Sequence, residues 1–517
     1  MGYFSVVSGV NMRLPGYETP KGMALLMQNY DRTHDEIVEQ IKGSSKYHGS
    51  NIGTSAPTAI MVNYNEDESK QDVLVAVDGS VLKKNFGANE FETLKSGFTP
   101  NMIRSGLNIE NKLYIPHPVD GLFEFDGIQT IAKVNAILLK DLVIDKGTNR
   151  CFGITADDEL AWTDDLADMG GAPLTWNGAN IATLPPTQGD VMEKLVLFNG
   201  RLVILKTNSI WVYYAIGSPS NWRLEKLAFA GGCISPWTVK IVNGELWFLG
   251  FSPETGRGLY SLDGAYKVKL LSYDVEPILN RINYHKIKDA CAEFVENIYK
   301  LAFALDSDTE NNHCFHFDSL NYNKETGVPN IYGLHTYGFS ASAILNTRIF
   351  RGEHLFARKH SDGARIFKVG DYRTQYSDEM SDNGSLIPAV LLSGIFQLEG
   401  KFDQTWYKRY KNLYVEYPPR GAWKTTVDIL KGFENETFES YDQYLEGGNV
   451  PLDALDLGSD ALDSESLSDE LHAMDFVSDS IQFRISNYNV NTKSAFRSIR
   501  YDAAPYRRKK SVQTIEV

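Results

Sequence analysis

Apolar residues recur along this chain as a repeated pair of short strands, the second of which is aromatic. Residues 113–115 and 121–125 form one such pair, and residues 246–249 and 258–262 form another. Seven copies align on one apolar anchor residue each, at spacings of 39, 39, 50, 44, 55 and 54 residues: Leu74, Leu113, Phe152, Leu202, Leu246, Leu301 and Leu355. Four short strands in about 40–50 residues are typical of one β-propeller blade. The pattern therefore predicts an all-β protein with a β-propeller of six to seven blades.

The turns between the expected strands are rich in glycine preceded by Asn or Asp. Such dipeptides accept a positive φ angle and favour two-residue hairpins. Five examples from the repeat region are each expected to be a tight turn: Asn177-Gly178, Asn199-Gly200, Asn243-Gly244, Asp263-Gly264 and Asp362-Gly363.

The strand repeat is confined to the middle of the sequence, and its limits divide the chain into three expected parts. Residues 1–65 form an N-terminal arm with the first strands, and residues 22–30 within it fit either a short helix or an extended segment. Residues 66–385 hold the propeller, with one helical turn at 275–282 that has a proline near its start. Residues 386–517 form an antiparallel, sandwich-like β domain, with strands expected at 413–417, 427–430, 481–485 and 496–501.

Two segments of the C-terminal part carry opposite charge. Residues 434–479 hold fourteen acidic residues and no Lys or Arg, whereas residues 481–510 hold eight basic residues and one acidic residue, Asp502. An insertion of that length between strands is usually functional or disordered. We interpret residues 434–479 as an extended loop that orders against a partner subunit. The acidic insertion and the basic tail could pair head-to-tail between identical subunits, or they could be unrelated solvated charges.

The overall charge restricts the kind of partner. The 517 residues include 51 Lys and Arg against 66 Asp and Glu, which gives a formal net charge of −15. Phosphate contacts need cations, so a protein that grips nucleic acid over a broad surface is not expected. The same acidity also fits a simpler role in solubility.

The cysteines and the apolar segments indicate in which cellular compartment the protein is expected. The four cysteines have no CxxC pair, which favours a reducing environment: Cys151, Cys233, Cys291 and Cys314. The first residues lack a basic segment followed by an apolar one, and no run of eighteen apolar residues occurs. Neither a signal peptide nor a membrane span is therefore expected.

The sequence contains few motifs that indicate catalysis, metal binding or cofactor binding. The sequence contains no P-loop, no HExxH, no GxSxG and no glycine-rich dinucleotide fingerprint. A strand over residues 313–318 would place Cys314, His316 and Asp318 on one face. Same-face neighbours lie about 7 Å apart, so three residues on one strand span too far to share a zinc ion. Ordinary packing is the better interpretation, and we expect no catalytic, metal-binding or cofactor-binding residues.

Carboxylates near strand ends keep a second class of function open, because propellers often house glycosidases. The candidates are Asp126, Asp164, Asp263 and Asp318. Glycoside hydrolysis would need two of them about 5–9 Å apart. Asp126 and Asp263 precede glycine, however, which is typical of a turn residue that accepts backbone hydrogen bonds. Three aromatic side chains could stack on sugars or simply pack in the core: Trp162, Trp176 and Trp222.

The order of strands over residues 161–264 also carries a family resemblance. It begins with Ala161-Trp162-Thr163-Asp164 and runs through 195–205 and 209–213 to 243–249 and 258–264. At the N-terminus, Ser8-Gly9-Val10-Asn11 and the segment 26–31 add to it. Together these segments resemble tailed-bacteriophage virion proteins of the tail hub, nozzle and DNA-stabilisation type, which are built on a β-propeller.

The resemblance implies a structural virion component and not an enzyme. It implies a ring, commonly of six copies, beneath the portal and its adaptor and around the channel for DNA ejection. Genomic DNA would pass without sequence-specific binding, and an acidic channel would limit sticking. Assembly would take place in the cytoplasm of the host bacterium, and the protein would reside in the tail of the virion. The alternative is a carbohydrate-binding or glycoside-hydrolysing β-propeller.

Overall fold

The structure is a computed structural model of the whole chain. It describes all residues except 1, 5–8, 16–17, 21, 33–36, 42, 65–70, 110, 167–173, 175, 185–188, 216–218, 324–326, 346–352, 362, 370–380, 383–384, 394, 397–405, 417–422, 432–435, 446–468, 479, 489–494, 497 and 509–517. Strands make up 61% of the structure and helices 4%, which confirms the predicted all-β class. No helix in the described part of the chain is long and apolar enough to cross a membrane.

The chain forms two compact units that do not follow its three expected parts. The seven-sheet unit comprises residues 44–320 and 337–371, and the terminal unit comprises residues 1–43, 321–336 and 372–517. The first strand of the seven-sheet unit's first sheet begins at Ala59, ahead of the expected boundary at residue 66.

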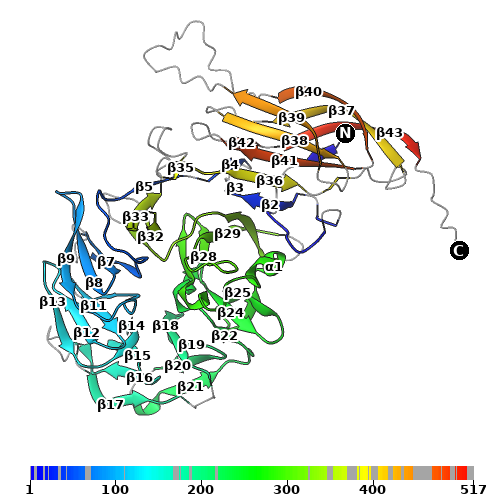
Figure 1. The fold of residues 1–517 in the computed structure, drawn as a ribbon. Helices are drawn as coiled ribbons and strands as arrows, with labels where there is room; N and C mark the ends of the chain where they lie inside the picture. Colours follow the sequence, from blue (N-terminus) through cyan, green and yellow to red (C-terminus); the bar gives the residue numbers. More distant parts are fainter. Residues whose placement is uncertain are drawn as a thin grey trace, which may run out of the picture. The chain divides into compact units, whose positions relative to one another are not determined.

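The seven-sheet unit is a succession of small antiparallel sheets (Figure 1). The first four sheets are β6 (Ala59–Tyr64), β7 (Gln71–Val77), β8 (Ser80–Asn85) and β9 (Glu90–Ser96); β10 (Leu107–Ile109), β11 (Lys112–His117), β12 (Gly121–Phe125) and β13 (Ile131–Asn135); β14 (Leu139–Asp145), β15 (Arg150–Thr155), β16 (Leu160–Thr163) and β17 (Trp176–Ala182); and β18 (Met192–Phe198), β19 (Arg201–Lys206), β20 (Ile210–Tyr214) and β21 (Arg223–Lys226).

The strands that this unit contributes to the remaining three sheets are β22 (Gly232–Cys233), β23 (Lys240–Val242), β24 (Glu245–Ser252), β25 (Gly256–Leu262) and β26 (Val268–Leu270); β27 (Cys291–Val295), β28 (Ile298–Phe303) and β29 (His313–Tyr322); and β31 (Ala341–Leu345), β32 (Glu353–His360), β33 (Gly363–Val369) and β5 (Ser44–Lys46). Two short helices lie within sheets, η2 (Pro219–Asn221) between β20 and β21 and η3 (Pro236–Thr238) between β22 and β23. Three more lie between β26 and β27: η4 (Tyr273–Val275), α1 (Glu276–Leu279) and η5 (Ile287–Asp289). Helix α1 confirms the helical turn predicted at 275–282.

The seven anchor residues of the sequence repeat lie on seven different sheets. They fall on β7, β11, β15, β19, β24, β28 and β32, and each is at most 2% exposed. The predicted pairs are present: Leu113 lies opposite Phe125, and Leu246 lies opposite Leu262. Each copy of the sequence repeat therefore corresponds to one small sheet.

Two of the five predicted turns show the expected backbone. Asn199-Gly200 has φ angles of 50° and 68°, and Asn243-Gly244 has 47° and 84°, as a two-residue hairpin requires. The turn predicted at Asn177-Gly178 is wrong, because both residues lie inside β17. The pairing of β16 with β17 shifts register there, between Ala161 and Thr163, and glycine is common at such bulges. Asp362 lies outside the described residues.

Each sheet of this unit packs against the next through apolar side chains. Residues of successive sheets share buried apolar clusters or ring contacts, in chain order Leu74 and Leu113, Tyr114 and Leu142, Phe152 and Leu202, Val203 and Phe248, Trp247 and Tyr299, and Ala302 and Phe356. The seventh sheet packs back on the first, where Leu355 shares a buried cluster with Val75. The packing contacts thus form a closed cycle.

A strand from the start of the unit completes its last sheet. In β5, Ser44 and Lys46 pair with Val369 and Phe367 of β33. Beyond β5 the chain continues along β33: Tyr47 donates its N–H to the Ile366 carbonyl (2.9 Å), and His48 Nε2 accepts the Ile366 N–H (3.0 Å). The two ends of the unit are therefore joined by hydrogen bonds within one sheet.

The terminal unit combines strands from both ends of the chain. Its sheets are β1 (Gly2–Phe4), β43 (Ser498–Arg508), β37 (Trp406–Glu416) and β40 (Asp469–Ser478); β2 (Ala24–Gln28), β36 (Ala389–Ser393), β41 (Ile481–Asn487), β38 (Trp423–Lys431) and β39 (Glu436–Leu445); and β3 (Tyr30–Arg32), β4 (Val38–Gln40) and β42 (Ala495–Phe496). It also contains β30 (Pro329–His335), β34 (Ser381–Asp382) and β35 (Ser385–Leu386). The strands predicted at 413–417, 427–430 and 481–485 fall on β37, β38 and β41, whereas the one predicted at 496–501 falls on two strands, the end of β42 and the start of β43. The segment 22–30 is extended, one of its two expected forms.

The two larger sheets of this unit meet through aromatic rings. Tyr501 of β43 and Phe483 of β41 have ring centroids 5.7 Å apart, and Phe396 contacts both rings. The loop expected over residues 434–479 is wrong at both ends, because β39 and β40 occupy them. β39 contains Phe438, Tyr441 and Tyr444, whose preference for strands offsets its acidic residues. Residues 446–468, the middle of the insertion, lie outside the described residues.

Acid should weaken the closure of the seventh sheet through His48. Burial, together with the nearby cations Arg365 and Lys84, lowers the pKa of His48 to about 4. The unfolded chain then binds more protons than the folded one between about pH 6.5 and 4, so stability falls as pH falls through this window. We expect a loss of about 2 kcal/mol between pH 7 and 5 from this residue.

Denaturant unfolding of the wild type and of His48→Gln at several pH values measures this contribution. Glutamine can accept the Ile366 N–H without titrating, so the variant should lose less stability on acidification. Parallel pH profiles for the two proteins would contradict the assignment.

Candidate functional site

The seven-sheet unit contains a cavity of about 310 Å³ that is partly open to solvent, which we call the axial cavity. Segments from six of the seven sheets line it: residues 58–62, 64, 104–106, 194, 236–237, 239–240, 291–292 and 340–344. They belong to, or directly adjoin, the first strands of their sheets, such as β6, β18, β27 and β31. The cavity is therefore the place where successive sheets converge.

Among the described residues that line the axial cavity, the charged ones are Arg104, Lys194 and Lys240, all basic. Each is paired with a carboxylate that does not itself line the cavity. Lys194 Nζ lies 2.7 Å from Asp141 Oδ1, and Lys240 Nζ lies 3.1 Å from both carboxylate oxygens of Glu293. These pairs link the fourth sheet to the third and the fifth sheet to the sixth.

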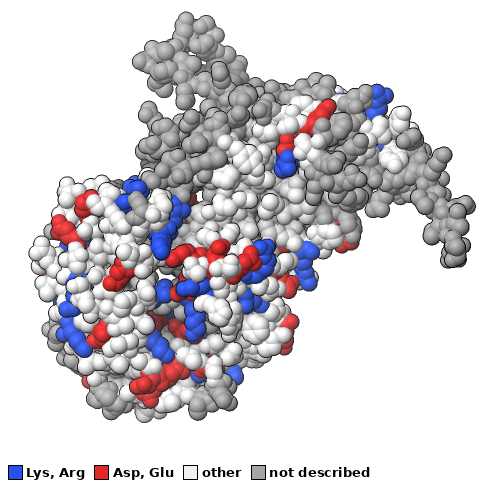
Figure 2. All heavy atoms as spheres, in the orientation of Figure 1, with Lys and Arg blue, Asp and Glu red and all other residues white. Residues whose placement is uncertain are grey.

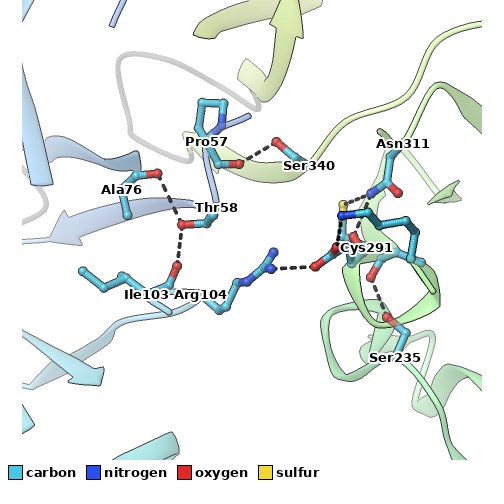
Figure 3. A network of polar contacts seen from close by, with 12 residues as sticks. Pro57, Thr58, Ala76, Ile103, Arg104, Ser235, Cys291, Asn311 and Ser340 are labelled. Atoms are coloured by element: carbon cyan, nitrogen blue, oxygen red, sulfur yellow. Dashed lines mark hydrogen bonds and ion pairs between the residues drawn. The ribbon is translucent and has the colours of Figure 1, made fainter. Parts of the chain in front are cut away.

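The third pair joins sheets that are not neighbours in the cycle. Arg104, just before β10 of the second sheet, places Nη2 2.6 Å from Asp289 Oδ1, just before β27 of the sixth sheet (Figure 3). A second such link joins Lys288 to Glu193 of β18, with Nζ 2.7 Å from Oε1. These side chains tie opposite parts of the cycle together.

The backbone beside Asp289 is held in place by hydrogen bonds. The Asn311 amide donates to the carbonyl oxygens of Asp289 (2.7 Å) and Phe339 (3.0 Å), and Ser235 Oγ donates to the Ala290 carbonyl (2.6 Å) (Figure 3). Asn311 is 9% exposed. The carboxylate that meets Arg104 is consequently carried by a well-supported segment.

Hydroxyl groups on the cavity wall are also engaged within the protein. Thr58 Oγ1 donates to the Ile103 carbonyl (2.7 Å), and Ser340 Oγ donates to the Pro57 carbonyl (2.5 Å). Ser342 Oγ donates to Glu293 Oε2 (2.9 Å). Thr58 thereby joins the segment before the first sheet to the segment before β10. Ser340 joins the seventh sheet to the segment before the first, and Ser342 joins the seventh sheet to the sixth.

The thiol in the wall of the cavity is poorly suited to nucleophilic chemistry. Burial raises the pKa of Cys291 to about 12, and Sγ donates to the Phe339 carbonyl at 2.9 Å. The thiolate is the reactive form of cysteine, and this environment disfavours it.

Two of the carboxylates considered for glycoside hydrolysis accept backbone hydrogen bonds within the turns that contain them. Asp126 Oδ1 accepts the N–H groups of Ile128, Gln129 and Thr130 at 2.8–2.9 Å. Burial alone would raise the pKa of Asp126, but these backbone hydrogen bonds outweigh it and lower the pKa. Asp263 Oδ1 likewise accepts two backbone N–H groups, from Ala265 and Lys267.

The other two carboxylates are also engaged locally. Asp164 accepts the side-chain amide of Asn180 at 2.8 Å, and Asp318 accepts the Leu320 N–H at 2.9 Å. The four carboxylates belong to the second, third, fifth and sixth sheets and none lines the axial cavity. The structure therefore does not bring them together there.

The strand at 313–318 packs as an ordinary strand. It forms the start of β29, where Cys314, His316 and Asp318 are all buried. His316 Nε2 lies 2.7 Å from the Tyr337 hydroxyl.

The three tryptophans weighed as sugar platforms contribute to packing between sheets. Trp162 is 8% exposed and contacts Trp222 edge-on at a centroid distance of 5.3 Å. Trp176 packs against the apolar cluster that joins the second and third sheets. These contacts support a role in packing for the tryptophan rings over a role in stacking on sugars.

Sequence reasoning missed the basic lining of the axial cavity. Arg104, Lys194 and Lys240 share no motif, and their spacing along the chain shows no common offset from the anchor residues. Only the cycle of sheets brings them to one place. A search against models of protein families and a search of curated proteins find no match for this chain.

Removing only one partner of the ion pair between Lys194 and Asp141 should destabilise the fold more than removing both. Asp141 is 1% exposed and accepts the Leu195 N–H as well (3.0 Å). Lys194→Met leaves this carboxylate buried without its cation, which should cost about 3 kcal/mol. Asp141→Asn combined with Lys194→Met removes both charges and should restore most of that loss, as measured by denaturant unfolding.

Equal stability of the single and double variants would contradict this account. The exposed pair of Arg281 and Asp306 offers a control, because Arg281→Met should change stability little.

Proposed function

We propose that this chain is a structural component of a bacteriophage tail, at the hub, the nozzle or the head-to-tail connection. In this proposal the seven-sheet unit is a seven-bladed β-propeller and several copies form a ring around the DNA ejection channel. The observation that carries the proposal is the closed cycle of seven small sheets, each packed on the next. It supports the propeller on which the family resemblance depends.

The way the cycle closes also supports a propeller. β5, from the start of the unit, completes the sheet formed by β31–β33 at its end. Propellers leave only short, protected edges, and joining both ends in one sheet removes the gap at which the cycle would otherwise open.

The size of the axial cavity supports a channel between copies and not through one. At about 310 Å³ the cavity is at the lower end of the range for small-molecule pockets. A DNA duplex, whose major groove alone is about 12 Å wide, needs far more room. A channel for DNA therefore requires a ring of several subunits.

The two N-terminal segments of the resemblance have structural duties that explain their residues. Gly9 has a φ of 82° and pairs with Ile331, whose carbonyl oxygen would lie 2.2 Å from an added Cβ atom. Asn29, fully buried, donates to Thr336 Oγ1 and to the Pro388 carbonyl, both at 2.7 Å. These requirements fit a family-specific way of joining the N-terminus to the terminal unit.

The carbohydrate-active alternative has less support. The carboxylates that would perform hydrolysis hold turns, and the tryptophans that would stack on sugars pack between sheets. We therefore propose a role that is not enzymatic. The expected partners are further copies of the chain, the portal or adaptor, and other tail proteins, and the expected location is the virion tail after assembly in the bacterial cytoplasm.

Surface charge is compatible with DNA passing nearby without binding. The net charge is −15, and acidic and basic side chains lie next to one another on the face seen in Figure 2. Electrostatic attraction of a polyanion needs a concentrated basic surface.

Purified full-length protein should self-associate into a ring. Light scattering after size-exclusion chromatography should give a mass several times 58.0 kDa, and negative-stain images should show rings with a central opening. A strict monomer that releases reducing sugar from bacterial polysaccharide would overturn the proposal in favour of the alternative.

The acidic insertion should contribute to contacts between copies. Residues 446–468 carry six acidic residues, which can be replaced by the corresponding amides: Glu446, Asp453, Asp456, Asp460, Asp463 and Glu465. This change leaves β39 and β40 in place, whereas deletion of 434–479 would remove both strands. We expect weaker ring formation at low salt with an unchanged melting transition.

As a control, six exposed acidic residues of the seven-sheet unit can be amidated in the same way: Asp157, Glu225, Glu254, Glu296, Asp306 and Glu310. Unchanged assembly of the first variant would exclude the insertion as a contact.

A further inference from the structure

We propose that the axial cavity of the seven-sheet unit binds a small multivalent oxyanion, of the phosphate or polyphosphate class. The proposal concerns a ligand site within one copy of the chain. It does not depend on the ring or on the virion role.

The cavity presents positive charge from three directions. Arg104 adjoins the second sheet, Lys194 lies on the fourth and Lys240 on the fifth, and the described residues of the lining include no acidic one. Their three carboxylate partners are not among the lining residues. Each cation is thus held by an ion pair and contributes to the wall of the cavity.

The cations retain hydrogen-bond donors for a ligand. An ammonium group has three N–H donors and a guanidinium group has five. Lys194 uses one of them on Asp141, and Arg104 uses one on Asp289. Lys194 Nζ also lies 5.3 Å from the ring centroid of Trp237, which lines the same cavity and restrains the side chain. A site whose donors are already positioned loses little entropy on binding.

The carboxylates behind the cations determine the kind of anion. The three pairs are neutral overall, so a single negative charge gains little net Coulomb energy. An anion with several charged oxygens can accept from two or three cations at once, and charge-assisted hydrogen bonds are about twice as strong as neutral ones. Arg104, Lys194 and Lys240 are each less than a third exposed, so screening of their interactions by solvent is reduced but not absent.

The volume of the cavity limits the ligand to a small molecule. About 310 Å³ accommodates a pyrophosphate or a compact phosphate ester, while a nucleic-acid chain does not fit. Inorganic pyrophosphate is therefore a suitable probe.

Titration calorimetry of the full-length protein with pyrophosphate, at constant ionic strength, tests the site. We expect saturable binding to one site per chain and no saturable binding of acetate. Asp141→Asn with Lys194→Met removes one cation together with its partner and should weaken pyrophosphate binding about 10–100-fold. Lys240→Met with Glu293→Gln should do the same, and it serves as the second variant if the first does not fold.

The matched control is the ion pair of Lys112 and Glu124, which has an N–O distance of 2.9 Å and lies in the same unit outside the cavity. Lys112→Met with Glu124→Gln should leave the dissociation constant unchanged. The proposal is overturned if pyrophosphate gives no saturable heat, or if a folded cavity variant binds as tightly as the wild type.

Discussion

The structure of the larger unit depends on one constraint: none of its seven sheets can bury its own apolar faces. The apolar faces of a small sheet stay in water unless they pack on a neighbour, and burying them stabilises the fold. In a linear row the first and last sheets would each leave one face exposed. Packing Leu355 of the seventh sheet with Val75 of the first removes both exposed faces at once. The hydrogen bonds of β5 with β33 then fix this closure.

Closure also determines what lies at the centre. Once the sheets form a cycle, segments from six of them converge on the axial cavity. The pairs of Arg104 with Asp289 and of Lys288 with Glu193 join sheets that are not adjacent. The most buried carboxylate of the ion pairs around the cavity, Asp141, would be costly without Lys194, because a buried charge needs a partner. The same arrangement leaves cations facing a cavity of small-molecule size.

The sequence predicts the repeating part of this structure well because each repeat is local. Leu113 and Phe125 pair across a short turn, so periodicity and turn residues are enough to place them. The closure is not predictable in that way, since Lys46 pairs with Phe367, more than 300 residues away. Nor is the junction of the termini, where Phe4 lies opposite Ile499. The basic lining of the cavity is invisible for the same reason: Arg104, Lys194 and Lys240 become neighbours only in the finished cycle.

Long-range closure has a consequence for assembly. Contacts between residues far apart in sequence form late, because the entropy of closing a long loop must be overcome first. Until β5 reaches β33, the last sheet has an open edge that can pair with another chain. The terminal unit, which needs β1 and β43 from opposite ends of the sequence, also forms only after the whole chain is available. Both units therefore reach their final fold only through contacts between residues that lie far apart in the sequence.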